Sequence, residues 1–218
     1  MKITILGTGN MGSALGKRWS EKGHHITYAS RNPQNERVQV LTREIGNGTK
    51  AVRADEAING TDVVVLATPW HSAEAALDQI GNIDGKILID ATNPIADGLS
   101  GLSIDSDTSA GEMISQWCPG AHIVKAFNTA TAKKILSPGN NGDRVSLPIC
   151  GNHQDAKDIV ANLAKDIGFD IYDAGPLKEA RYIEPMAMTW VKLTYKEGYG
   201  PDMAFKMIKR QVDEEHSN

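Results

Sequence analysis

The chain has 218 residues, of which 40% are hydrophobic and 23% charged, and its formal net charge is −4. This composition is ordinary for a globular protein and excludes a disordered or fibrous chain. The acidic balance favours neither a nucleic-acid nor an anionic-membrane partner, and no run of about 18 apolar residues predicts a membrane span.

Short apolar runs alternate with helix-like segments through the first half of the chain. We expect these runs to form strands at residues 3–6, 26–29, 50–53, 63–67, 87–89 and 123–126. Most are uninterrupted, which is typical of parallel strands buried on both faces. Between the first two runs, Met11, Leu15 and Trp19 are four residues apart and share a helix face. This βαβ order predicts an α/β fold with a doubly wound, mostly parallel Rossmann sheet.

The second half of the chain continues with fewer elements. Strands are predicted at 145–150 and 169–172, and an apolar stripe from Ala156 to Ile167 predicts a helix between them. We expect residues 1–128 to form a Rossmann core and residues 129–218 a smaller C-terminal α/β extension packed on it.

The end of the chain carries a second helical region, in which Met186, Trp190 and Leu193 could share a face. Asp202 is expected to cap a last short helix after a Gly-Pro break. Residues 140–143 predict a turn, and the acidic residues 213–215 predict a fraying tail.

A glycine-rich loop directly follows the first predicted strand and opens a helix. Its residues, all predicted to bind a dinucleotide, are Gly7, Thr8, Gly9, Asn10, Met11 and Gly12. Gly7 would permit the tight turn, Gly9 would let the backbone approach a diphosphate, and Gly12 would let the helix pack closely. The helix N-terminus presents free N–H groups and a partial positive charge to phosphate.

The second strand ends at Ser30 and Arg31, where NAD-binding proteins commonly carry an acidic residue for the ribose 2′-hydroxyl. A guanidinium and a hydroxyl suit a 2′-phosphate instead, and Thr8 could reach the same group. These residues predict NADP rather than NAD.

Three further loops follow predicted strands, and they are expected to hold ribose and nicotinamide. Their residues are Thr68, Pro69 and Trp70; Ala91, Thr92, Asn93 and Pro94; and Ala126, Phe127, Asn128 and Thr129. Trp70 could equally be a core or lid residue. We find no serine nucleophile motif, no metal-binding motif and no pair of acid–base carboxylates, a pattern that suits transfer between two cofactors better than ketone or imine reduction.

The ordered set of motifs resembles the family of NADPH-dependent reductases of the deazaflavin coenzyme F420, and it is similar to the cytosolic domain of the STEAP metalloreductases. The resemblance spans nearly the whole chain and includes residues 7–12, 68–70, 90–94, 125–129, 148–151 and 173–177. It implies NADPH at the glycine loop and at Ser30 and Arg31, with a second cofactor over the nicotinamide near Phe127 and Asn128, which would act as positioning residues. The family's deazaflavin enzymes tend to carry His where Asn128 stands, and Asn35 replaces a basic residue beside the 2′-phosphate.

The function indicated is hydride transfer between NADP(H) and FMN, FAD or coenzyme F420. Two alternatives remain open: an imine or carbonyl reductase of the pyrroline-carboxylate reductase type, and an NADP-binding sensor without turnover.

Cys118 and Cys150 show no disulfide or metal-site spacing, and the first residues lack a secretory signal, so the cytoplasm is expected. The methionine-rich region at residues 179–210 predicts a homodimer contact, with packing in the protein's own core as the open alternative.

Overall fold

The computed structural model describes residues 1–139 and 144–208, and within them an eight-stranded sheet has the order β3-β2-β1-β4-β5-β6-β7-β8. The strands are β1 (Lys2–Leu6), β2 (His25–Ala29), β3 (Lys50–Val52), β4 (Val63–Leu66), β5 (Ile87–Asp90), β6 (His122–Lys125), β7 (Ser146–Gly151) and β8 (Asp170–Asp173). The first six pair in parallel, and the order 3-2-1-4-5-6 is that of a Rossmann sheet. The predicted fold class is confirmed.

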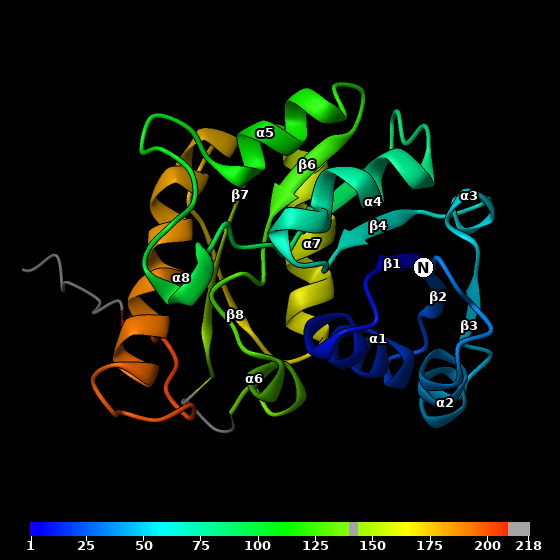
Figure 1. Ribbon diagram of the computed structural model, residues 1–218, viewed down its shortest axis with the longest axis horizontal. Helices are drawn as coiled ribbons and strands as arrows, with labels where there is room; N and C mark the ends of the chain where they lie inside the picture. The colour runs from blue at the N-terminus through cyan, green and yellow to red at the C-terminus, as the bar shows by residue number, and fades with distance from the viewer. Residues whose placement is uncertain (140–143, 209–218) are drawn as a thin grey trace, which may run out of the picture.

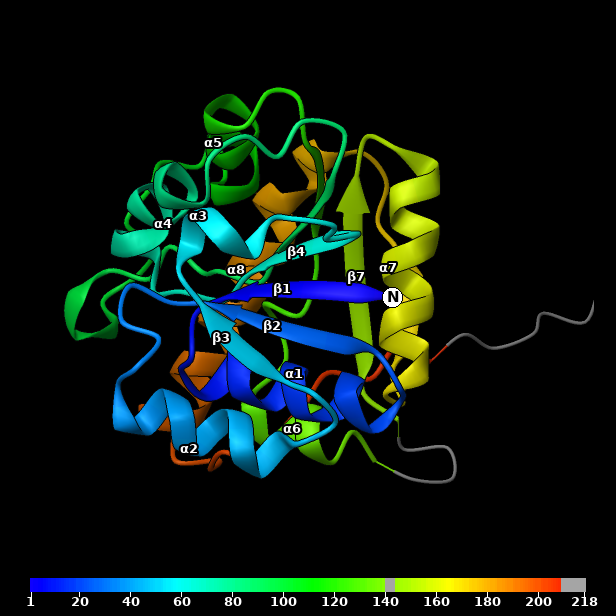
Figure 2. The ribbon, with the colours of Figure 1, turned by 90° about the vertical axis from the view of Figure 1, so that its right-hand side faces the viewer.

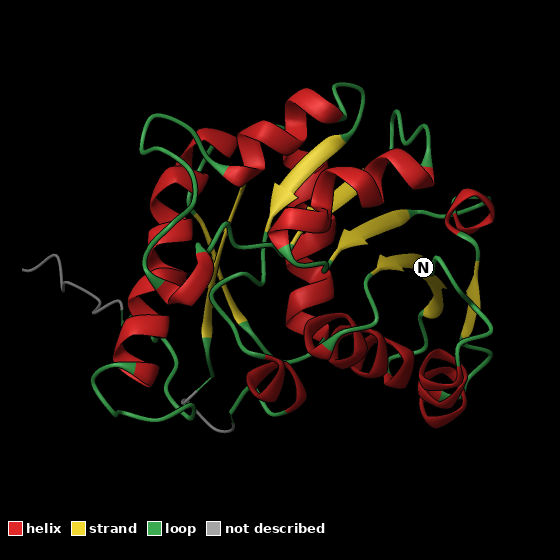
Figure 3. Ribbon diagram, viewed as in Figure 1, coloured by secondary structure: helices red, strands yellow, loops and turns green. Residues whose placement is uncertain are grey.

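Helices cover both faces of the sheet (Figures 1 and 3). They are α1 (Asn10–Glu21), α2 (Glu36–Ile45), α3 (Ala54–Ala57), α4 (Ala73–Ile80), α5 (Ala110–Trp117), α6 (Ala132–Leu136), α7 (Gln154–Asp166) and α8 (Ala180–Tyr195), with short 3-10 turns η1 (Trp70–Ser72), η2 (Asp97–Leu99) and η3 (Leu177–Glu179). Buried side chains of α1, α6 and α7 form one core with Ile3, Ile5, Val63 and Val65, whereas those of α3, α4, α5 and α8 form a second core with Leu66. Alternate strand residues therefore face opposite cores, as both-face burial of parallel strands requires.

The C-terminal residues extend this sheet. β7 runs antiparallel to β6 and pairs in parallel with β8. In Figure 2, β7 runs at a steep angle to β1, and α7 packs beside β7. The sheet is therefore strongly twisted between these strands. α8 then returns along the opposite side of this extension and faces the loops that follow β5 and β6 (Figure 1).

The predicted strands agree with the structure to within about one residue, but the predicted last helix is wrong. Asp202 ion-pairs with Lys133 at 2.6 Å, and residues 202–208 form no helix. The predicted turn at 140–143 and the acidic tail at 213–215 lie outside the described residues. Among the described helices, none is long and apolar enough to cross a membrane.

Candidate functional site

The glycine loop between β1 and α1 has the tight geometry expected of a diphosphate loop. Gly7 has φ +114°, and a Cβ there would lie 2.5 Å from the carbonyl oxygen of Ala67. A Cβ on Gly12 would lie 2.1 Å from the carbonyl oxygen of Gly7. Both positions therefore require glycine, the first for its backbone angle and for space, the second for space alone.

The N-terminus of α1 is open for a ligand. Gly9 is the N-cap, no side chain of residues 1–139 or 144–208 caps the helix, and its first turn carries no acidic residue. A Cβ on Gly9 would meet no atom within 4 Å. Thr8 and Asn10 are exposed beside it, and Met11 is half-buried. Free N–H groups and the helix dipole at such an end suit a diphosphate, so the residues present fit the cofactor.

The end of β2 presents a free cation. Ser30 is half-buried and its Oγ accepts from the backbone N–H of Asn32 at 3.2 Å. Arg31 is exposed, and no hydrogen bond or ion pair within the described residues holds its guanidinium. Asn35 instead caps α2, its side chain accepting from the N–H of Arg37 at 3.0 Å. The Arg31 guanidinium is thus available to an anion at this end of the sheet.

Two residues of the loop after β4, Thr68 and Trp70, differ in how they could contact a ligand. The Thr68 hydroxyl is buried and has no hydrogen-bond partner within the described residues, while Pro69 is exposed. Trp70 stacks on Trp117 of α5, with ring centroids 5.3 Å apart and planes 23° apart. The Trp70 ring is therefore already packed against another side chain of the protein, whereas the Thr68 hydroxyl, next to the glycine loop, can still form a hydrogen bond to a ligand.

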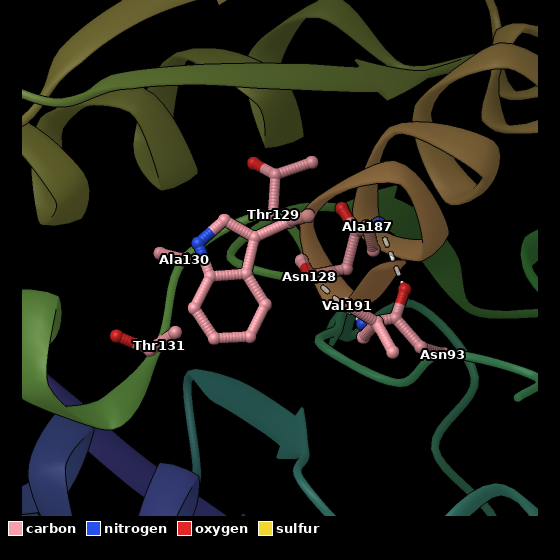
Figure 4. Close-up of a pocket in the computed structure, with 8 residues that line it drawn as sticks. Asn93, Asn128, Thr129, Ala130, Thr131, Ala187 and Val191 are labelled. Carbon is pink, nitrogen blue, oxygen red and sulfur yellow. Dashed lines mark hydrogen bonds between the residues drawn. The ribbon is translucent and has the colours of Figure 1, made fainter. Parts of the chain in front are cut away.

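A cavity of about 120 Å³ lies where the loops after β5 and β6 meet α8 (Figure 4). It is lined by Asn93, Asn128, Thr129, Ala130, Thr131, Ala187, Trp190 and Val191. Asn93 Nδ2 donates to the carbonyl oxygen of Asn128 at 2.7 Å, and Asn128 Nδ2 donates to Asn93 Oδ1 at 3.0 Å. The buried Asn128 Oδ1 and Thr129 Oγ1 have no partner within the described residues, so they are free to bind a polar ligand.

Phe127 is not among the residues that line the cavity. It has φ +66°, which is unusual for a bulky residue, and its ring is fully buried. The ring packs edge-on against Trp19 at 5.6 Å and against Phe169 at 6.1 Å between centroids. This left-handed turn anchors the loop in the core and leaves the next side chain, Asn128, at the cavity.

A buried charge cluster, consisting of Asp90, Lys125 and Glu184, lies next to the cavity loops. Lys125 Nζ lies 2.9 Å from Asp90 Oδ2 and 2.9 Å from Glu184 Oε1, and all three side chains are at most 1% exposed. Burial alone would lower the pKa of Lys125, but the two carboxylates raise it above its usual value. Lys125 is therefore a charged partner in an ion-pair network.

Sequence reasoning missed this cluster. Asp90 and Lys125 each end an apolar strand and are paired in register on β5 and β6, which was a usable signal. Glu184 lies far away in sequence, and nothing in the sequence indicated that it joins the cluster.

The remaining predicted residues lie in the loops after two strands. Ala91, Thr92 and Pro94 are buried in the loop after β5, and Ala126 is buried after β6.

Comparisons with known sequences and structures identify the family of this chain. Residues 2–94 match the family described as NADP oxidoreductase coenzyme F420-dependent. The chain is 30% identical over 210 residues to the F420-dependent NADP reductase of Methanothermobacter marburgensis, covering 90% of this chain and 93% of the relative. It is 28% identical to metalloreductase STEAP3 of Rattus norvegicus, spanning 86% of this chain but only 36% of that relative.

Among solved structures, one from Arthrobacter sp. FB24, described as that of an F420-dependent NADP reductase, has a TM-score of 0.87 and 31% identity, covering 96% of this chain and 100% of that chain. A reductive aminase from Aspergillus terreus has a TM-score of 0.65 at 18% identity, with 90% of this chain and 62% of that chain covered, and this likeness shows the fold alone. The chain therefore belongs to the family of coenzyme F420-dependent NADP oxidoreductases, and it is an NADP-dependent oxidoreductase.

Proposed function

We propose that the protein transfers a hydride between NADP(H) and a flavin or a deazaflavin of the coenzyme F420 type. The observation that carries this proposal is the lining of the cavity, whose eight residues are amides, hydroxyls or apolar groups. None of the eight can donate a catalytic proton, which an imine or carbonyl acceptor would require. A flavin-type ring accepts hydride without an enzymatic acid, so alignment and exclusion of water are the protein's main tasks.

NADP would lie along the carboxyl edge of the parallel strands. When bound, it supplies or accepts the hydride at its nicotinamide ring. The helix N-terminus at Gly9 would bind the diphosphate, and Arg31, Ser30 and Thr8 would bind the 2′-phosphate. The other predicted contacts are Gly7, Asn10, Met11, Gly12, Thr68, Pro69, Trp70, Ala91, Thr92, Asn93, Pro94 and Ala126.

The nicotinamide end would be fixed by groups from two loops. The unpartnered Asn128 Oδ1 and Thr129 Oγ1 can accept from a carboxamide N–H, and the Thr129 hydroxyl can also donate to its carbonyl oxygen. Ala187 and Val191 of α8 add apolar surface to the lining of the same cavity. Residues 1–128 would thus hold NADP, and residues 129–218 would complete the acceptor pocket.

The test is NADPH oxidation, followed at 340 nm, with FMN, FAD, the deazaflavin, ferric chelates, a pyrroline and small 2-oxo acids as separate acceptors. We expect turnover with a flavin or the deazaflavin. Turnover confined to the pyrroline or the 2-oxo acids would favour the imine or carbonyl reductase instead. Tight NADPH binding without oxidation by any acceptor would indicate a sensor.

We further propose a homodimer in a reducing compartment such as the cytoplasm. Three tyrosines of the C-terminal region are strongly exposed: Tyr182 at 72%, Tyr195 at 64% and Tyr199 at 70%. Cys118 and Cys150 are both free, as expected where thiols stay reduced. Light scattering on the wild type and on Tyr182→Lys tests the dimer, which the charged variant should weaken.

A further inference from the structure

We propose that the buried charge cluster positions the two walls of the cavity against each other, and so sets the distance between the nicotinamide and the hydride acceptor. Asp90, Lys125 and Glu184 would be positioning residues, since none of them lines the cavity. The kinetic test of this inference depends on the proposed function. The structural test, by hydrogen–deuterium exchange, is independent of it.

The first wall is the loop after β5. Asp90 Oδ1 accepts from the N–H of Thr92 at 2.9 Å and from its hydroxyl at 2.7 Å. Lys125 Nζ donates to the carbonyl oxygen of Thr92 at 2.8 Å. Both polar backbone groups of Thr92 and its side chain are therefore held by the cluster. The next residue, Asn93, lines the cavity. The cluster therefore fixes the position of the backbone from which Asn93 enters the cavity lining.

The second wall is α8. Glu184 lies on the same helix face as Ala187 and Val191, three and seven residues further on, and both of these line the cavity. Glu184 also accepts from the N–H groups of Ala110 and Gly111 at 3.0 and 3.2 Å. The cluster thus joins α8 to the first turn of α5 and to the end of β6.

α8 depends on this attachment because of Pro185. A proline within a helix cannot donate to the carbonyl oxygen one turn earlier, so the helix is weaker at this point. The cluster holds α8 at Glu184, within the turn that lacks this bond and three residues before Ala187, the first residue of the helix that lines the cavity. Loss of the Glu184 charge should therefore release the wall without disturbing the glycine loop at the end of β1.

The fold should survive single substitutions at either end of the cluster. Glu184→Gln leaves the balanced pair of Asp90 and Lys125, and Asp90→Asn leaves the balanced pair of Lys125 and Glu184. Neither variant leaves a lone charge in the core, which would be the costly case. Lys125→Met would leave two buried carboxylates without their cation, so this variant would be expected to unfold.

The kinetic test compares both variants with the wild type using the best acceptor. We expect kcat to fall by about tenfold or more, because small misplacement of reacting groups has large effects on rate. The dissociation constant for NADPH should change by less than about twofold, since the diphosphate loop is intact. The matched control is Lys157→Met, which breaks the ion pair of Lys157 and Asp173 at 2.7 Å, a pair that lies outside the cavity lining. A loss of melting temperature like that of the control, with kcat and KM unchanged, would show a merely stabilising cluster and overturn the proposal.

A second measurement holds even if no acceptor is found and the proposed function fails. Hydrogen–deuterium exchange of the wild type, Glu184→Gln and Lys157→Met reports helix docking directly. We expect Glu184→Gln to speed exchange in residues 186–195 while α1 and α7 keep their protection. Unchanged exchange in residues 186–195, or exchange raised evenly along the chain, would refute the positioning role.

Discussion

Asn93 and Asn128 join two strand-end loops through two hydrogen bonds: Asn93 Nδ2 donates to the backbone carbonyl oxygen of Asn128 at 2.7 Å, and Asn128 Nδ2 donates to Asn93 Oδ1 at 3.0 Å. Asn128 Nδ2 also lies 3.3 Å from the carbonyl oxygen of Ile183, to which it donates. One amide therefore ties the loop after β6 to the loop after β5 and to α8. Its Oδ1 is buried and has no partner within the described residues, so Asn128 braces the loops and, in the proposed function, can also accept a hydrogen bond from the nicotinamide.

Replacing Asn128 by Ala should lower kcat by about one to two orders of magnitude, because the nicotinamide loses a contact and its loops lose their brace. Stopped-flow measurement of NADPH oxidation gives the rate of the hydride step. Asn152→Ala is the control, since Asn152 accepts a backbone bond from Leu177 at 2.9 Å outside the cavity. Equal rates for the two variants would argue against a role for Asn128.

Gly9→Ala should separate cofactor binding from folding. Its Cβ would meet no atom of the described residues within 4 Å and its φ of −77° suits alanine, so the free energy of unfolding should fall by no more than about 1 kcal/mol, the cost of alanine at an N-cap. The same methyl group would point into the space proposed for the diphosphate, and NADPH affinity should fall by about tenfold or more. Gly12→Ala should instead lower both, because its Cβ would lie 2.1 Å from the Gly7 carbonyl oxygen. Titration and urea unfolding of the two variants give both quantities, and unchanged affinity in Gly9→Ala would contradict the loop's assignment.

Arg31→Ala should weaken NADPH binding by about ten- to a hundredfold, the value of a charged hydrogen bond to phosphate. NADH binding should barely change, because NADH has no 2′-phosphate. Fluorescence titration with both cofactors measures the ratio. Arg43→Ala, an exposed arginine near the far end of α2, should leave the ratio as in the wild type. Equal losses for NADPH and NADH in Arg31→Ala would remove Arg31 from the 2′-phosphate site.

Phe127→Ala should destabilise the protein by about 3–5 kcal/mol, as loss of a fully buried aromatic ring does. Alanine carries the same Cβ at the same positive φ, so the difference reports the ring contacts with Trp19 and Phe169 rather than the backbone. Phe127→Leu should cost less than about 1.5 kcal/mol, since it keeps most of the volume. Urea unfolding measures both, and a loss below 1 kcal/mol for the alanine variant would mean that the ring is no anchor.

Local pattern predicted the sheet and the glycine loop because both depend on neighbours in sequence. Uninterrupted runs such as residues 63–67 can only be buried on both faces, and Gly7 and Gly12 are read directly from their spacing. The cavity could not be predicted in this way. It depends on α8, which is brought against Asn93 by the path of the extension, and on the turn at Phe127, whose positive φ no neighbouring residue demands. Glu184 likewise became visible as a partner of Lys125 only once β5, β6 and α8 were placed together.

The ion pair of Glu112 and Arg181 predicts a pH dependence of stability. Arg181 donates to both carboxylate oxygens of Glu112, at 2.7 and 2.8 Å, and joins α5 to α8. The guanidinium, helped by the Ser109 hydroxyl and opposed by burial, holds the pKa of Glu112 below its usual value. A carboxyl whose pKa is lowered by folding stabilises the native state above its unfolded pKa of about 4.3, and this contribution is lost as pH falls through the folded pKa.

Glu112→Gln should therefore be less stable than the wild type at pH 7, and the difference should shrink below about pH 4, when the wild-type carboxyl becomes protonated as well. Urea unfolding of both proteins between pH 7 and pH 3 measures the difference. Glu74→Gln, which alters an exposed carboxylate on α4, is the control for removing a carboxylate that no salt bridge holds within the described residues. A Glu112→Gln difference that stayed constant, or grew toward low pH, would show that the pair does not carry this charge-dependent link between α5 and α8.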